Sequence, residues 1–100
     1  MISTKQRAFL RGLAAELTPV TQIGKNGITE NLIKTLSDAL EAHELVKVTV
    51  LETSPVDAKE AMEVLTEALH CDPVQVIGRK VTVYRRQPDA DKRKIQLPRA

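Results

Sequence analysis

Residues 24–27, Gly24-Lys25-Asn26-Gly27, have the residue types and spacing that best fit a chemical role. They follow a β-branched segment and precede a helical pattern that Thr29 can cap, which is typical of a loop between a strand and a helix. Glycines let such a backbone turn tightly, the helix start offers amide groups and a positive dipole end, and Lys25 adds a charge. We therefore predict that this GKNG loop (residues 24–27) and Thr29 grip a nucleic-acid backbone, as the GxxG loop of KH domains does. Bulkier residues at both glycines are expected to weaken binding and leave the fold nearly intact.

Charge is segregated along the chain, although the net charge is only +2. Residues 1–27 carry four Lys or Arg against one acid, residues 28–78 carry three against ten, and residues 79–100 carry eight against two. If the two basic ends converge in the fold, one face of the protein attracts a polyanion. The basic surface around the loop is accordingly predicted to include Lys5, Arg7 and Arg11 near the N-terminus, and Arg79, Lys80, Arg85 and Arg86 on the strand side.

The sequence contains few side chains that could act in catalysis or bind a metal ion. Only His43 and His70 could exchange protons near neutral pH, and His43 falls on the apolar side of its helix, which favours a core or capping position over a ligand role. His70 and Cys71 are adjacent, which is poor spacing for zinc, and no second cysteine exists. No nucleophile elbow, Walker loop or dinucleotide fingerprint is present. We expect no enzymatic activity, no metal, no cofactor and no small-molecule substrate.

The aromatic residues narrow the mode of nucleic-acid contact. Phe9 and Tyr84 are the only two, and Phe9 belongs by its spacing to a core stripe. A row of stacked bases, as in an RRM or an OB-fold, is therefore not expected. Phosphate and shape contacts to structured RNA fit better, and they predict strong salt dependence with modest sequence specificity.

The elements that must position these residues follow the order αβαβαββ. Ser3 and Gln6 have the spacing of a capping box, Ser54 is expected to cap the third helix, and Asp72-Pro73 is expected to end it. Gly78-Arg79 predicts an antiparallel hairpin. The expected elements are helices over residues 4–17, after 29 and after 54, and strands over 20–23, 45–51, 74–77 and 81–84.

This order predicts an α+β, two-layer domain with a mixed four-stranded sheet packed against helices. Each strand–helix–strand unit is expected to be a right-handed crossover between parallel strands. Residues 1–86 form the expected domain, and residues 87–100 form a basic tail that is flexible unless it docks. No apolar run approaches the roughly 20 residues of a membrane span and no signal peptide is apparent, so we expect a cytoplasmic protein without membrane contact.

The chain resembles the CRM (chloroplast RNA splicing and ribosome maturation) domain, most closely the free-standing YhbY-like bacterial proteins. The resemblance implies a fold similar to the C-terminal domain of a bacterial translation initiation factor with an added N-terminal helix. It also implies RNA binding through the GKNG loop, with precursors of the large ribosomal subunit as partner. Such domains commonly have a glycine where His70 to Pro73 stand here, so local capping is expected to differ. The matching segments are residues 3–7, 12–14, 23–30, 43–48, 74–79, 84–85 and 94–99.

Two other functions remain open from the sequence. In the first, the acidic helices or an exposed sheet edge bind an assembly factor, and RNA contact is incidental. Salt titration separates the two, because phosphate contacts make affinity fall steeply with salt whereas an apolar interface does not. In the second, the chain is a small enzyme or enzyme subunit, which would require a catalytic constellation that the sequence does not display.

Overall fold

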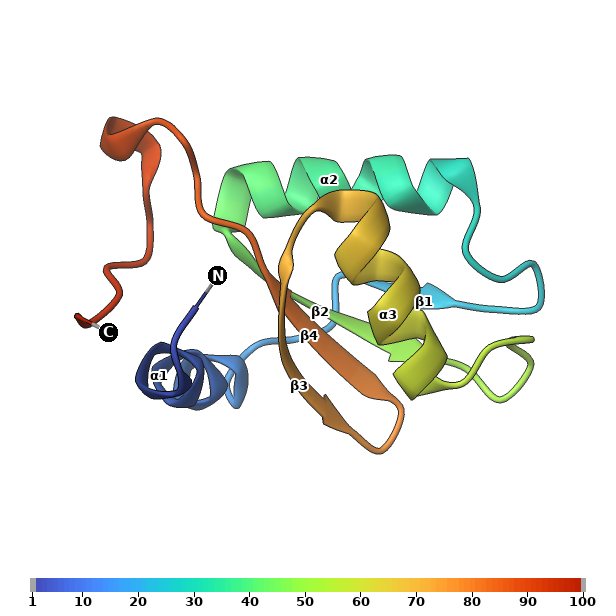
Figure 1. The fold of residues 1–100 in the computed structure, drawn as a ribbon. Helices are drawn as coiled ribbons and strands as arrows, with labels where there is room; N and C mark the ends of the chain where they lie inside the picture. Colours follow the sequence, from blue (N-terminus) through green and yellow to red (C-terminus); the bar gives the residue numbers. More distant parts are fainter. Residues whose placement is uncertain (1, 100) are drawn as a thin grey trace.

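A computed structural model describes residues 2–99 of the chain (Figure 1). Three α-helices and four strands follow the predicted order, and a short 3-10 turn that was not predicted comes after them. Their bounds are α1 Thr4–Ala14, β1 Thr21–Ile23, α2 Glu30–His43, β2 Leu45–Val50, α3 Ala58–Leu69, β3 Asp72–Ile77, β4 Lys80–Tyr84 and η1 Ala90–Lys92.

The four strands form one mixed sheet in the order β1-β2-β4-β3. β1 lies parallel to β2, whereas β4 is antiparallel to both of its neighbours, β2 and β3. β3 therefore runs in the same direction as β2, with β4 inserted between them. This arrangement confirms the predicted mixed sheet and the β3–β4 hairpin.

The main core lies between the sheet and helices α2 and α3, which cover the same face (Figure 1). Val46, Val48 and Val50 alternate inward along β2, as the pattern of that strand predicts. Leu36 and Leu40 of α2 complete this layer and are fully buried. His43 is exposed in the last turn of α2, so of its two predicted positions, core or helix end, the core position is wrong. Glu44 directly after it is buried.

Helix α1 packs on the opposite face of the sheet and forms a second, smaller cluster with β2–β4 and the C-terminal segment. The predicted capping box is present, because Ser3 and Gln6 bond each other's backbone amides. The helix ends at Ala14 and not at residue 17. It buries Leu10, whereas Phe9 is 40% exposed, so the expectation of Phe9 in a core stripe is wrong.

Both ends of α3 differ from the prediction. Asp57 is the N-cap and accepts from the Glu60 amide, while the Ser54 hydroxyl is occupied in a local turn with the backbone of Val56. The helix ends at Leu69 because His70 adopts a left-handed conformation, with φ of 51°, which leads the chain directly into β3. Asp72 and Pro73 thus belong to a strand. Proline is tolerated there because β3 is an edge strand with a register shift after Pro73.

The segment after β4 docks on the domain. The Glu44 side chain is fully buried and accepts backbone amides of Gln87, Lys94 and Ile95. Ile95 and Leu97 pack on the second cluster. The two chain ends also meet, since the Gln6 side chain donates to the Pro98 carbonyl at 2.9 Å.

Candidate nucleic-acid interface

The GKNG loop joins β1 to α2 and projects from one end of the molecule (Figure 1). Lys25 and Asn26 are exposed at its tip. The Gly27 amide donates to the Gly24 carbonyl at 2.9 Å, so the loop is a closed turn and the Gly27 N–H is already used. The Lys25 ammonium and the Asn26 side chain are exposed at the tip and can reach a ligand.

The two glycines have different structural roles. Gly27 has a φ of +68°, and a Cβ there would lie 3.2 Å from Cγ of Pro55. Both facts make any side chain at this position costly. Gly24 has no such restriction, since its nearest neighbour would be Cδ1 of Leu51 at an ordinary 3.8 Å. The expectation that both glycines can be replaced without harm to the fold is thus wrong for Gly27.

Thr29 caps α2 as predicted, with its hydroxyl accepting from the Leu32 amide at 3.1 Å. The amides at the very start of the helix lack intrahelical partners and give that end a partial positive charge. Glu30, in the first turn, lowers the attraction for an anion at this end.

A groove of about 430 Å³ runs beside the loop and the first turns of α2. It is lined mainly by neutral polar side chains, with Lys25 as the only charged one: Thr21, Gln22, Lys25, Asn26, Thr29, Asn31 and Thr35. Four of these groove residues, Thr21, Gln22, Asn31 and Thr35, were not predicted from the sequence. The spacing of the last two, four residues apart on one helix face after the N-cap, could have indicated them.

Arg79 and Lys80 lie at the same edge of the sheet as the loop. Ile23 pairs with Val50 at the end of β2, and Lys80 pairs with Thr49 one residue earlier. Arg79 and Lys80 are both exposed, and Arg79 forms an ion pair with Glu52 at 3.1 Å. These two cations are separated from the loop by the width of β2 and the turn that follows it.

The N-terminal cations lie elsewhere. Helix α1 is at the other end of the molecule from the GKNG loop, so Lys5, Arg7 and Arg11 do not extend the basic surface around it (Figure 1). Arg7 donates to the Pro73 carbonyl at 3.1 Å, and Arg11 donates to the Val74 carbonyl at 3.4 Å. The predicted convergence of the termini occurs, but at the end of the domain remote from the loop.

Arg85 and Arg86 are neighbours with different environments. The Arg85 guanidinium donates to the carbonyls of Leu69 and Ser37 at 3.1 and 2.8 Å and thereby ties the end of α3 to α2. Arg86 is exposed at the terminal end of the molecule. Neither lies at the GKNG loop.

Cys71 and His70 lie outside the groove beside the GKNG loop. Cys71 is buried and donates to the Leu65 carbonyl, and this burial raises the pKa of its thiol to about 11. Among residues 2–99, no three His, Cys, Asp or Glu side chains lie close enough together to hold a metal ion, so His70 and Cys71 have no third ligand there. Over the same residues, no helix is long and apolar enough to span a bilayer.

The mixed four-stranded sheet with helices on both of its faces defines a small α+β domain. The chain belongs to the CRS1/YhbY (CRM) domain family, which matches residues 2–85. This is a family of RNA-binding proteins, as the resemblance implied.

Individual relatives agree with this assignment. The Bacillus subtilis protein YqeI, named a probable RNA-binding protein, is 39% identical over 98% of this chain and all of its own length. A Haemophilus influenzae protein named an RNA-binding protein is also 39% identical, over 98% of this chain and 96% of that protein. The solution structure of a Staphylococcus aureus protein, described as a candidate RNA-binding protein, shares 45% identity. It superposes with a TM-score of 0.81 over 98% of this chain and all of that one.

Proposed function

We propose that this protein binds structured RNA, ribosomal RNA in particular, through the GKNG loop and the groove beside it. In this proposal the protein acts in the cytoplasm during assembly of the large ribosomal subunit. The observation that carries the proposal is the exposed turn at residues 24–27, which places Lys25 and Asn26 at the mouth of a polar groove beside a helix N-terminus. A phosphodiester fits this combination of an ammonium group, amide donors and hydroxyls.

Two substitutions test the loop without disturbing the fold. Lys25→Gln removes the exposed charge, and Gly24→Ala adds a methyl group that meets only Leu51, at a normal contact distance. We expect Lys25→Gln to weaken RNA binding about five-fold and to reduce the slope of log affinity against log salt by about 1. Because the proposal requires RNA to approach this backbone closely, we also expect Gly24→Ala to weaken binding.

Lys34→Gln is the matched control, because it removes the same charge from an exposed position on α2 that does not line the groove. Gel-shift or filter-binding titrations at several salt concentrations measure all three variants. Wild-type affinity and an unchanged salt slope in both loop variants would exclude the loop as the RNA contact. A shallow salt slope in the unmodified protein would favour the protein-interaction module instead.

The role in ribosome assembly has a separate test. When a cell extract is sedimented through a sucrose gradient, we expect the protein in the fraction that contains precursors of the large subunit. Lys25→Gln should move part of it to the top of the gradient. Sedimentation of the unmodified protein only with free protein would contradict the assembly role without affecting RNA binding.

A further inference from the structure

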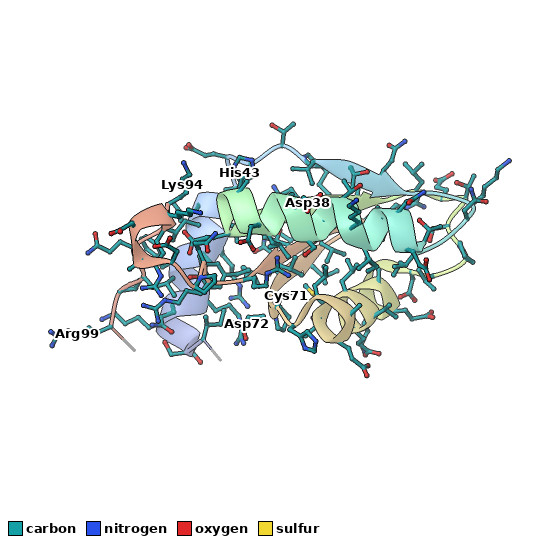
Figure 2. The ribbon with its side chains drawn as sticks, turned by 90° about the horizontal axis from the view of Figure 1, so that it is seen from above. Asp38, His43, Cys71, Asp72, Lys94 and Arg99 are labelled. Atoms are coloured by element: carbon teal, nitrogen blue, oxygen red, sulfur yellow. The ribbon has the colours of Figure 1, made fainter. Side chains whose placement is uncertain are left out.

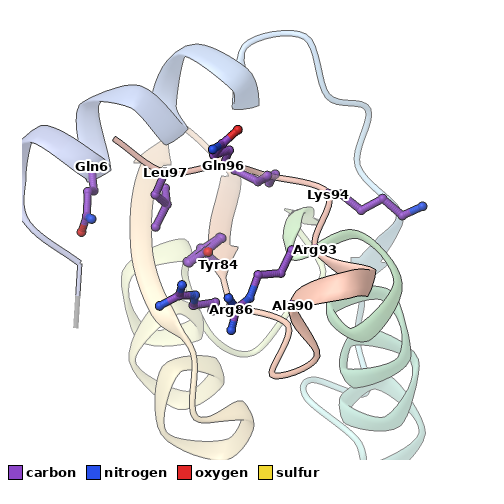
Figure 3. Close-up of a pocket in the computed structure, with 9 residues that line it drawn as sticks. Gln6, Tyr84, Arg86, Ala90, Arg93, Lys94, Gln96 and Leu97 are labelled. Atoms are coloured by element: carbon purple, nitrogen blue, oxygen red, sulfur yellow. The ribbon is translucent and has the colours of Figure 1, made fainter. Parts of the chain in front are cut away.

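A second cationic cavity lies at the end of the molecule opposite the GKNG loop. Its volume is about 600 Å³, which is in the range of ligand sites in proteins. It is enclosed by the start of α1, the end of β4 and the docked tail (Figure 3). Its charged lining residues are Arg86, Arg93 and Lys94, and no acid lines it. Figure 2 shows Lys94 and Arg99 at this end, where α2 finishes at His43.

The two arginines are placed to act together. Arg86 and Arg93 both approach the Tyr84 ring, which forms the buried wall of the cavity (Figure 3). Burial raises the pKa of the Tyr84 hydroxyl, the Glu44 carboxylate raises it further, and both arginines oppose that rise. Arg93 is held in place, since its Nε donates to the Gln87 carbonyl at 2.7 Å. Within residues 2–99, Arg86 has no side-chain hydrogen bond or ion pair, so its guanidinium is available to a ligand.

Two acids, Glu44 and Asp72, act on the Tyr84 side chain at the wall of this cavity. Glu44 is fully buried behind it, and its carboxylate already accepts three backbone amides of the tail. Asp72 is partly buried opposite Tyr84 in the β3–β4 register. Neither carboxylate lines the cavity, whereas the guanidinium groups of Arg86 and Arg93 do, and these two charges favour an anion there.

We propose that this tail-built cavity is a second RNA contact that binds a phosphate group between Arg86 and Arg93. Guanidinium groups suit a phosphate because their paired N–H donors match its oxygens. The site extends the proposed function. With the GKNG loop at the other end of a molecule 39 Å long, one protein would contact two separate RNA segments.

Titration of the isotopically labelled full chain with inorganic phosphate, followed by NMR, tests the cavity directly. We expect shifts at the backbone amides of residues 84–86 and 93–97 that saturate in the millimolar range. Arg86→Gln should weaken this binding about five-fold. Lys92→Gln is the matched control, because Lys92 belongs to the same segment but does not line the cavity, and it should leave phosphate binding unchanged.

The RNA phosphate can be a terminal monoester or a backbone diester, and two short single-stranded oligonucleotides separate these sources. One carries a 5′-phosphate and the other a 5′-hydroxyl. Shifts with the first alone identify a terminal phosphate, and equal shifts with both identify the backbone. The proposal is overturned if neither oligonucleotide nor phosphate perturbs the cavity, or if Arg86→Gln behaves like Lys92→Gln. Normal response of the Lys25→Gln protein in this titration shows that the cavity acts independently of the loop.

Discussion

Replacing Glu44 by glutamine tests how the C-terminal segment is held on the domain. The two carboxylate oxygens accept three backbone amides: Oε1 those of Lys94 and Ile95, and Oε2 that of Gln87. Glutamine has nearly the same shape, but it retains only one acceptor oxygen and places an NH₂ group against one of the amides. Because the φ of 68° at this position is the same for both residues, the substitution isolates the carboxylate.

The size of the effect follows from these contacts. Hydrogen bonds to a charged group contribute roughly 1.5–3 kcal/mol each, whereas neutral ones contribute roughly 0.5–1.5 kcal/mol. Losing one of these bonds and weakening the other two from charged to neutral gives a penalty of about 4–5 kcal/mol if the tail stays docked. The tail can also detach, in which case the penalty cannot exceed the free energy that docking supplies. We therefore expect a loss of about 2–3 kcal/mol, which for a domain of this size lowers Tm by roughly 10–20 °C.

Thermal denaturation and amide hydrogen exchange measure the two parts of this prediction. Exchange should accelerate at Gln87, Lys94 and Ile95 more than in the main core. Glu41→Gln is the control, because that carboxylate is 63% exposed and its ion pair with Arg85 is long, at 3.7 Å. It should change stability by less than about 0.5 kcal/mol. A Glu44→Gln protein as stable as wild type, with unaltered exchange at these amides, would refute the anchoring role.

Two further predictions concern stability alone. Arg85→Gln should lower the free energy of unfolding by about 2 kcal/mol, because it removes the donors shared by Leu69 and Ser37. Chemical denaturation should show that Arg79→Gln, at an exposed position, lowers the free energy of unfolding by less than about 0.5 kcal/mol. Equal losses in the Arg85 and Arg79 variants would contradict a tie between the helices. Stability should also fall as pH rises from about 9 to about 11. In this range the thiol of folded Cys71, with a pKa of about 11, keeps its proton, whereas the unfolded thiol, with a pKa of 9.0, loses it. Denaturation midpoints at pH 8 and 10.5 should differ less in Cys71→Val than in wild type, and identical differences would exclude the thiol as a cause.

The sheet and its connections could be predicted from the sequence because their signals are local. The alternation of β2 decides which of its residues face inward, and Gly78 marks the hairpin. Helix α1 was harder, since Phe9, Leu13 and Leu17 form a stripe next to that of Leu10 and Ala14. Only the stripe of Leu10 and Ala14 is buried, because it faces the sheet and the docked tail, which together form the second cluster.

Glu44 shows a different limit of the sequence. A glutamate after the last turn of a helix is ordinarily a solvated charge. It is buried here because the tail, more than 40 residues later, brings backbone amides to it. Helical periodicity places His43 on the apolar side, but the helix ends there, and the chain turns the next residue inward instead. Contacts of this kind depend on tertiary structure and leave no pattern in the local sequence.

The largest difference between sequence and structure concerns the cations, and it changes how RNA contact should be understood. Charge counts group Lys5 and Arg86 with Lys25, because they record only that both chain ends are basic. The fold places the termini at one end and the GKNG loop at the other, with the acidic helices along one face between them. A single RNA strand lying on one continuous basic face does not fit this distribution. Two separate contacts do, so the Lys25→Gln and Arg86→Gln effects on binding to a long structured RNA should be additive in free energy.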